Sequence, residues 1–295
     1  MARAPTLAAV LQAYYALVTL AALASTQLPF LARWARFGKL HHAAAREPAA
    51  HWLTAALDVR VPKRRFVHFY VLGCATCAAT IAAVLRAGGA CALLRGVPAA
   101  RAPSAPGADS ALCLAMLCAH VARRLYECVR VERPSGEMHV LAYILGLSYY
   151  ALLPAAAVAE CVERPRAAGG GGASWMAARR LGALGVYAWA SVHQHRCHRI
   201  LAQLRAPPPP GARAAPRYRV PYGDWFAHAS CPHYLAEALI YAALVLAKPR
   251  DATLGALVAW VLVSHAINAR RAHAWYRATF GHYPRSRAAL VPGVF

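Results

Sequence analysis

Acidic residues are scarce in this chain, which holds 11 Asp and Glu against 33 Lys and Arg and carries a formal charge of +22. A soluble domain would spread such charge over its surface. Here basic clusters alternate with long apolar runs, and 59% of the residues are hydrophobic. This pattern is typical of a polytopic membrane protein. Part of the basicity belongs to an excess of Ala and Arg that a GC-rich genome explains, so we expect no nucleic-acid partner.

The sequence also lacks a G-x-G-x-x-G segment between a strand and a helix, and it shows no alternation of strand and helix patterns. These absences exclude a Rossmann nucleotide-binding unit. Any nucleotide site must therefore be built by the membrane spans and their loops.

Metal-binding patterns are weak. Cys74 and Cys77 form one C-x-x-C pair inside an apolar segment, and no second pair completes four ligands. The run HQHRCHRI at 193–200 looks like a zinc cluster, but its ligands would share a helix face with Arg196 and Arg199. We expect packing roles here and no metal.

Seven segments are apolar enough to be membrane spans. Three are shorter than the ~20 residues that a helix needs to cross hydrocarbon, so they must extend into flanking amphipathic sequence. We expect an all-α integral membrane fold of about seven transmembrane helices, forming a single polytopic domain over 1–295. The segments are 6–30, 66–85, 110–121, 138–159, 173–192, 232–247 and 253–267.

The basic residues predict the orientation of these spans. The segments 31–65, 122–137, 193–231 and 268–295 contain 23 of the 33 Lys and Arg residues. Because positive charge is retained on the cytosolic side, we expect a luminal N-terminus and a cytosolic C-terminus.

Two spans carry polar residues near the predicted cytosolic side. His233 and Glu237 lie four residues apart, on the helix face that also holds Tyr241. Ionisable residues in a span are costly to bury and indicate a functional site. Pro232 suits the first helical turn, with Ser230 or Cys231 as the cap.

The last span repeats this arrangement. A polar stripe of His265, Asn268, His273 and Tyr276 falls on one side of the predicted helix. Either His alone could be an interhelical hydrogen-bonding residue. Two polar stripes at the same depth favour a shared pocket.

Three segments combine into a specific pattern: HQHRCHRILAQLR, YRVPYGDWFAHASCPHYLAEALIY and WYRATFGHYPRSRAALVPGVF. Together they resemble the steroid 5-alpha-reductase family, and within it the polyprenol reductase branch. The segments DVRVPKRRFVHFY and MHVLAYILGLSYYALL extend the resemblance over most of the chain, and the part from about 175 to 295 carries most of the motifs.

The resemblance implies a reductase of the endoplasmic reticulum membrane that uses NADPH. Its substrate would be a long-chain polyprenoid lipid, polyprenol or polyprenal, whose isoprene double bond nearest the oxygen is saturated. The product would enter dolichol biosynthesis and support protein N-glycosylation. The lipid substrate and the bilayer are the expected partners.

Position by position, the resemblance also implies a cofactor site. His233 and Glu237 match positions that contact the nicotinamide half of NADPH. Arginines suit its phosphates because a guanidinium binds phosphate through two parallel hydrogen bonds. The cofactor residues implied are Glu237, His233, Arg205, Arg124, Arg133, Asn268, Tyr276 and Asp224.

The chain departs from the steroid branch at the proton donor. The tyrosine that polarises the steroid carbonyl is matched here by Val121, so that donor is absent or relocated. Hydride adds to an alkene when the developing charge is delocalised into a carbonyl, which favours the aldehyde as the immediate substrate. We expect His273 to be the catalytic donor, with Tyr70, His68 and His120 as alternatives.

Other functions stay open at this point. One is a steroid 3-oxo-5-alpha reductase-like enzyme. Another is an isoprenylcysteine-type membrane methyltransferase, which would use S-adenosylmethionine. A third is a non-catalytic scaffold or transporter whose polar stripes only pack helices.

Overall fold

The computed structural model describes residues 5–28, 31–32, 58–86, 107–161, 173–205 and 218–295. The Gly-rich tract at 169–172 lies outside these ranges. Each of the seven predicted spans is a helix, which confirms the all-α expectation. Within the described ranges the α-helices are α1 (Leu7–Gln27), α5 (Phe66–Arg86), α7 (Gly107–Arg130), α8 (Val140–Val158), α9 (Ala173–Leu204), α10 (Pro232–Ala247) and α11 (Ala252–Thr279).

Local sequence signals set several helix ends. Thr6 caps α1 by accepting a hydrogen bond from the amide of Ala9, and Asp251 caps α11 by accepting one from Leu254. Cys231 is the N-cap of α10, and Pro232 occupies its first turn, as predicted. The loop before α10 contains a 3-10 turn, Asp224–Ala227.

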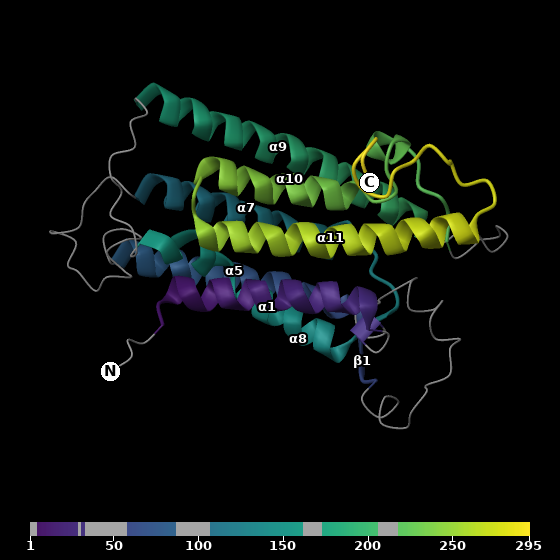
Figure 1. Cartoon of the computed structure of the whole chain (residues 1–295), viewed down its shortest axis with the longest axis horizontal. Coiled ribbons are helices and arrows are strands. Elements are labelled where there is room, and N and C mark those ends of the chain that lie inside the picture. Colours follow the sequence, from purple (N-terminus) through teal and green to yellow (C-terminus); the bar gives the residue numbers. More distant parts are fainter. Residues whose placement is uncertain (1–4, 29–30, 33–57, 87–106, 162–172, 206–217) are drawn as a thin grey trace.

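The helices lie side by side and alternate in direction, so the start of α1 and the end of α11 are at opposite ends of the bundle (Figure 1). A two-stranded antiparallel sheet joins α5 to α8. It pairs β1 (Arg60–Pro62) with β2 (Glu137–His139), with Arg60 opposite His139.

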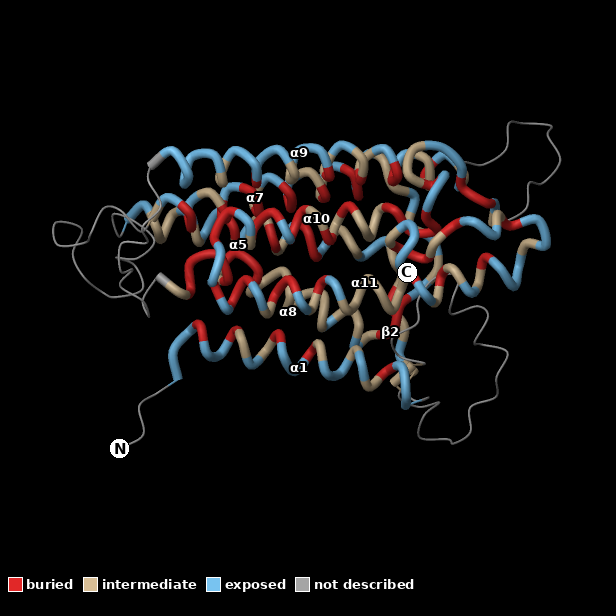
Figure 2. The backbone as a smooth tube through the Cα atoms, turned by 45° about the horizontal axis from the view of Figure 1, so that its top comes forward, coloured by how far each residue is buried: buried red, intermediate tan, exposed pale blue. Residues whose placement is uncertain are grey.

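The centre of the bundle is occupied by α10, which is buried along most of its length, whereas the outer face of α9 is exposed (Figure 2). The main neighbours of α10 are α9 and α11. Large apolar side chains, among them Leu17, Leu20 and Leu181, are exposed on the outside. An exposed apolar surface of this kind suits a lipid environment.

Four helices are long and apolar enough to cross a membrane: α1, α5 with its preceding turn, α8 and α11. The shorter α10 is also apolar apart from its polar residues His233 and Glu237. The helices α7 and α9 are longer than their predicted apolar segments, because each continues into charged sequence, to Arg130 and to Leu204. The expected extension is confirmed for two of the three short spans, which become α7 and α11, whereas α10 keeps its predicted length of 16 residues.

Candidate active site

A cavity of about 430 Å³ lies between α1, α8 and α11, in the half of the bundle where α11 ends. Most of its wall is apolar, formed by residues such as Val18, Leu145 and Trp260. The polar part of the wall includes Glu237, His265, Asn268 and Arg271. An apolar cavity with a few convergent polar groups is the usual form of a small-molecule site.

Glu237 is fixed at this wall from two neighbouring helices. Its Oε1 atom lies 3.0 Å from His120 Nε2 of α7. Its Oε2 atom accepts a hydrogen bond from the side-chain amide of Gln194 in α9. Each carboxylate oxygen can accept a further hydrogen bond, so the group can still receive a donor from a ligand in the cavity.

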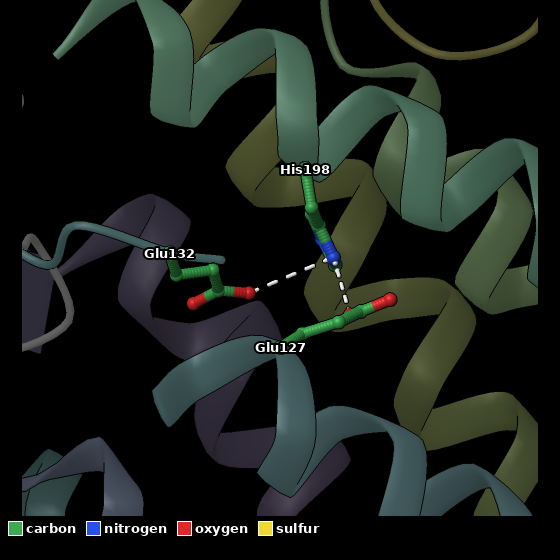
Figure 3. A group of neighbouring side chains, drawn as sticks. All are labelled: Glu127, Glu132 and His198. Atoms are coloured by element: carbon green, nitrogen blue, oxygen red, sulfur yellow. Dashed lines mark hydrogen bonds and ion pairs between the residues drawn. The ribbon is translucent and has the colours of Figure 1, made fainter. Parts of the chain in front are cut away.

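A cluster of charged side chains lies next to Glu237, where α7 meets α9. Glu127 of α7 is fully buried, and one of its oxygens is 2.8 Å from the Nδ1 atom of His198 (Figure 3). Its other oxygen is 2.8 Å from the Nδ1 atom of His195. Arg123 and Arg124 each approach the same carboxylate at 2.5 Å. Buried charges persist when they are paired in this way.

Glu127, Glu132 and His198 are close enough together to resemble a metal site, with ligand atoms within 4.8 Å of one another. Arg124 fills this position instead. Its Nη1 atom lies 2.5 Å from Glu127, 2.6 Å from Glu132 and 2.8 Å from His198. Burial raises the pKa of Glu132, but the Arg124 guanidinium and His198 outweigh it and hold that pKa below its usual value. The group is an ion-pair cluster centred on a guanidinium.

Several of the predicted cofactor residues come together around this cluster. The ring of His233 is 5.8 Å from that of His198, and the backbone carbonyl of His233 accepts a hydrogen bond from Gln194. Arg205, at the end of α9, is exposed but acts electrostatically on Tyr234 and Tyr276. It therefore lies on the same side of the bundle as the polar residues of α10 and α11.

Other predicted cofactor residues lie apart from the cavity wall. Asp224 has a positive φ of 45° and pairs with His193 at 2.7 Å, which ties its loop to α9. Tyr276 is buried and stacks on Tyr283, with ring centroids 5.2 Å apart. Arg133 is exposed beyond the end of α7. Asn268, in contrast, lines the cavity.

The three predicted catalytic groups have other partners in the structure. His273 Nδ1 is 2.6 Å from Ser230 Oγ. Tyr70 is buried, and its hydroxyl accepts a hydrogen bond from Arg124 at 2.8 Å. His68 is exposed and lies 2.7 Å from the Tyr143 hydroxyl. Their catalytic role stays a prediction.

Val121, which replaces the expected tyrosine, is fully buried in the main core. A Cβ atom added at Gly73 would come within 2.9 Å of Val121, so the side chain is enclosed by α5. Val121 itself offers no hydrogen-bond donor at this position.

Sequence reasoning missed the residues that organise the site. Glu127, Gln194 and His198 were not predicted as site residues, although Gln194 and His198 are four residues apart and so share one helix face. That spacing was the available signal. Their partners on α7, Arg123 for Gln194 and Glu127 for His198, were not visible, because more than sixty residues separate them along the chain.

Comparison with known proteins places the chain in a family. Residues 170–295 match the family model described as 3-oxo-5-alpha-steroid 4-dehydrogenase. The polyprenal reductase of Mus musculus is 34% identical over 286 residues, covering 88% of this chain and 85% of that protein. The polyprenal reductase of Homo sapiens is 34% identical over 275 residues, covering 88% and 84%. Polyprenal reductase 2 of Arabidopsis thaliana is 34% identical over 206 residues, covering 60% and 58%. The chain therefore belongs to the steroid 5-alpha-reductase family, within which it is similar to the polyprenal reductases over most of its length.

Proposed function

We propose that this protein reduces the double bond nearest the oxygen of a long-chain polyprenoid, with polyprenal as the immediate substrate and NADPH as the reductant. The observation that carries this proposal is the apolar cavity whose polar wall includes the anchored carboxylate of Glu237. The similarity of the chain to polyprenal reductases agrees with it.

The cavity fits the reacting end of such a lipid. Its walls from α1 and α8 are mainly apolar side chains, which suit isoprene units. A volume of about 430 Å³ holds only the first part of a long polyprenoid. The remainder of the lipid would stay in the bilayer.

The polar residues fit the proposed cofactor. The carboxylate of Glu237 is held by His120 and Gln194 and retains acceptor capacity, so it can receive the carboxamide N–H₂ of a nicotinamide. Arg205 lies near the polar residues of α10 and α11 and is available for phosphate. When bound, NADPH supplies a hydride to the β-carbon of the conjugated aldehyde. Arg124, already paired with two carboxylates, would help to organise the site.

A steroid is a weaker candidate for the substrate. The position that carries the carbonyl-polarising tyrosine in the steroid branch is Val121, whose apolar side chain is fully buried. We place the enzyme in the endoplasmic reticulum membrane, where its product would enter dolichol synthesis and support N-glycosylation.

The test is a substrate panel with protein purified in detergent. Polyprenal, polyprenol and a steroid enone are each incubated with NADPH, and S-adenosylmethionine with a prenylated cysteine substrate serves as the methyltransferase arm. We expect saturation of the α-isoprene unit of polyprenal that depends on NADPH. Reduction of the steroid alone, methyl transfer, or no reaction in any arm would refute the proposal.

A further inference from the structure

His265 of α11 is an imidazole in the wall of the apolar cavity. Its Nδ1 atom is buried, and neither ring nitrogen has a hydrogen-bond partner among the residues that the structure describes. Buried polar atoms in proteins are nearly always hydrogen-bonded. An unsatisfied imidazole at a cavity wall therefore points to a polar group on the ligand.

The surroundings of His265 fix its ring beside Glu237. The imidazole stacks on Tyr234, with ring centroids 4.7 Å apart and planes 12° from parallel. Glu237 lines the same cavity and interacts electrostatically with His265. In the proposed function Glu237 binds the nicotinamide of the cofactor. His265 therefore lies next to the place where the substrate would react.

Other donors in the cavity wall already have acceptors. The Tyr149 hydroxyl donates to Tyr241 at 2.6 Å. The Ser264 hydroxyl donates to a backbone carbonyl of its own helix at 3.1 Å. Arg271 donates to Ser25 of α1 at 2.9 Å.

Three further wall residues could donate a hydrogen bond: Asn268, Trp260 and Tyr150. The amide of Asn268 and the indole N–H of Trp260 can donate one, but neither transfers a proton at neutral pH. Tyr150 packs edge-on against the rings of Tyr70 and Tyr149, each 5.1 Å away. An imidazole can both donate and transfer a proton near neutral pH, so we take Tyr150 as the alternative that the test must separate from His265.

We propose that His265, as an imidazolium held beside the Glu237 carboxylate, donates a hydrogen bond to the carbonyl oxygen of the bound polyprenal and then transfers its proton to that oxygen, leaving a neutral imidazole. This assignment rests on the proposed function. As the hydride bonds to the β-carbon, the electron pair of the carbon–carbon double bond forms a new double bond to the aldehyde carbon. The carbonyl π pair moves onto oxygen, which takes the imidazole proton and gives an enol.

Three proton transfers complete the balance. The imidazole regains its proton from solvent, and the enol becomes the saturated aldehyde when its α-carbon gains a proton and its hydroxyl loses one. The net reaction consumes one NADPH and one proton. The contribution of His265 is to stabilise the negative charge that develops on oxygen inside an apolar cavity, where a preorganised donor is most effective.

The first test is spectroscopic and needs no turnover. Polyprenal labelled with ¹³C at the aldehyde carbon is bound to the protein without NADPH, and its carbonyl stretch is recorded by isotope-edited infrared spectroscopy. A hydrogen bond to oxygen lowers this frequency. We expect a lowered stretch in the parental protein and in His282→Phe, which changes an exposed histidine. We expect the frequency typical of apolar solvent in His265→Phe, which keeps an aromatic ring on Tyr234.

An unchanged stretch in His265→Phe would overturn the assignment, as would loss of the shift in Tyr150→Phe with retention in His265→Phe. If His265→Phe does not fold, His265→Leu also removes both ring nitrogens and gives the same comparison.

The second test is kinetic and separates this inference from the proposed function. With polyprenal and NADPH, His265→Phe should lower turnover on the order of 10²-fold while the affinity for NADPH is retained. The isotope effect of NADPH deuterated at the transferred position should rise, because hydride transfer becomes more rate-limiting. If His265→Phe keeps the parental turnover, the role of His265 is refuted and the proposed function is unaffected. A parental protein that does not reduce polyprenal would refute the proposed function itself.

Discussion

Glu237 shows how a single carboxylate can be prepared for a ligand. His120 and Gln194 hold its two oxygens from different helices, so the side chain is positioned before any cofactor arrives. The sequence predicted the importance of this residue, because a carboxylate in an apolar span is costly unless it has partners. The two partners could not be predicted, since each lies on a separate helix.

Glu237→Gln is expected to weaken the positioning of the nicotinamide. The neutral amide accepts through one atom only, so it cannot receive hydrogen bonds from both His120 and Gln194 and still bind a carboxamide. We expect the NADPH affinity or the turnover to fall at least tenfold, which is about 1.4 kcal/mol. Nucleotide titration and steady-state kinetics measure this, with Glu137→Gln, at the exposed first residue of β2, as the control. Unchanged values in a folded variant would remove Glu237 from the site.

His273 can be judged by separating catalysis from stability. The sequence predicted that His273 is the catalytic donor, but in the structure its Nδ1 atom is hydrogen-bonded to Ser230 Oγ. The same Oγ atom lies 2.7 Å from the Tyr283 hydroxyl. These contacts tie the C-terminal tail to α11. We therefore expect His273→Ala to lower the free energy of unfolding by about 1 kcal/mol, the usual value for one hydrogen bond. Turnover per folded molecule should change much less. A loss of turnover on the order of 10²-fold with normal stability and NADPH binding would instead support the catalytic role.

At the scale of elements, hydrophobic patterns predicted the seven helices, while pairing between helices set the details of the site. The apolar segments 110–121 and 173–192 are each part of a longer helix. The added turns carry charges that pair with one another where α7 packs against α9.

The polar stripe of α11 is divided: His265 and Asn268 face the cavity, and His273 and Tyr276 face the C-terminal tail. A helical projection cannot show this division, because it depends on what packs against each turn.

Glu127→Gln tests whether the charged cluster holds α7 against α9. The change removes the buried anion and leaves Arg123 and Arg124 with less compensation. Breaking a buried ion pair by removing one partner costs about 3–5 kcal/mol. We expect a loss of that order in unfolding measurements in detergent, whereas Arg130→Gln at the exposed end of α7 should have little effect. Equal stability of Glu127→Gln and the parental protein would show that the cluster is not structural.

At the scale of the whole molecule, the alternating helices place the start of α1 and the end of α11 on opposite sides (Figure 1). Which side is cytosolic stays a prediction from the basic segments. A tag after Phe295 should be accessible from the cytosol, and a glycosylation acceptor inserted near position 170 should be modified in the lumen. A protected tag together with an unmodified acceptor would contradict the predicted orientation.

The most direct test of the central claim follows the hydride itself. Purified protein is given polyprenal and NADPH deuterated at the transferred position, and the product is analysed by mass spectrometry and NMR. The proposed function predicts a saturated α-isoprene unit with one deuterium on the former β-carbon. A product labelled at the aldehyde carbon with its double bond intact, or no consumption of NADPH, would contradict it.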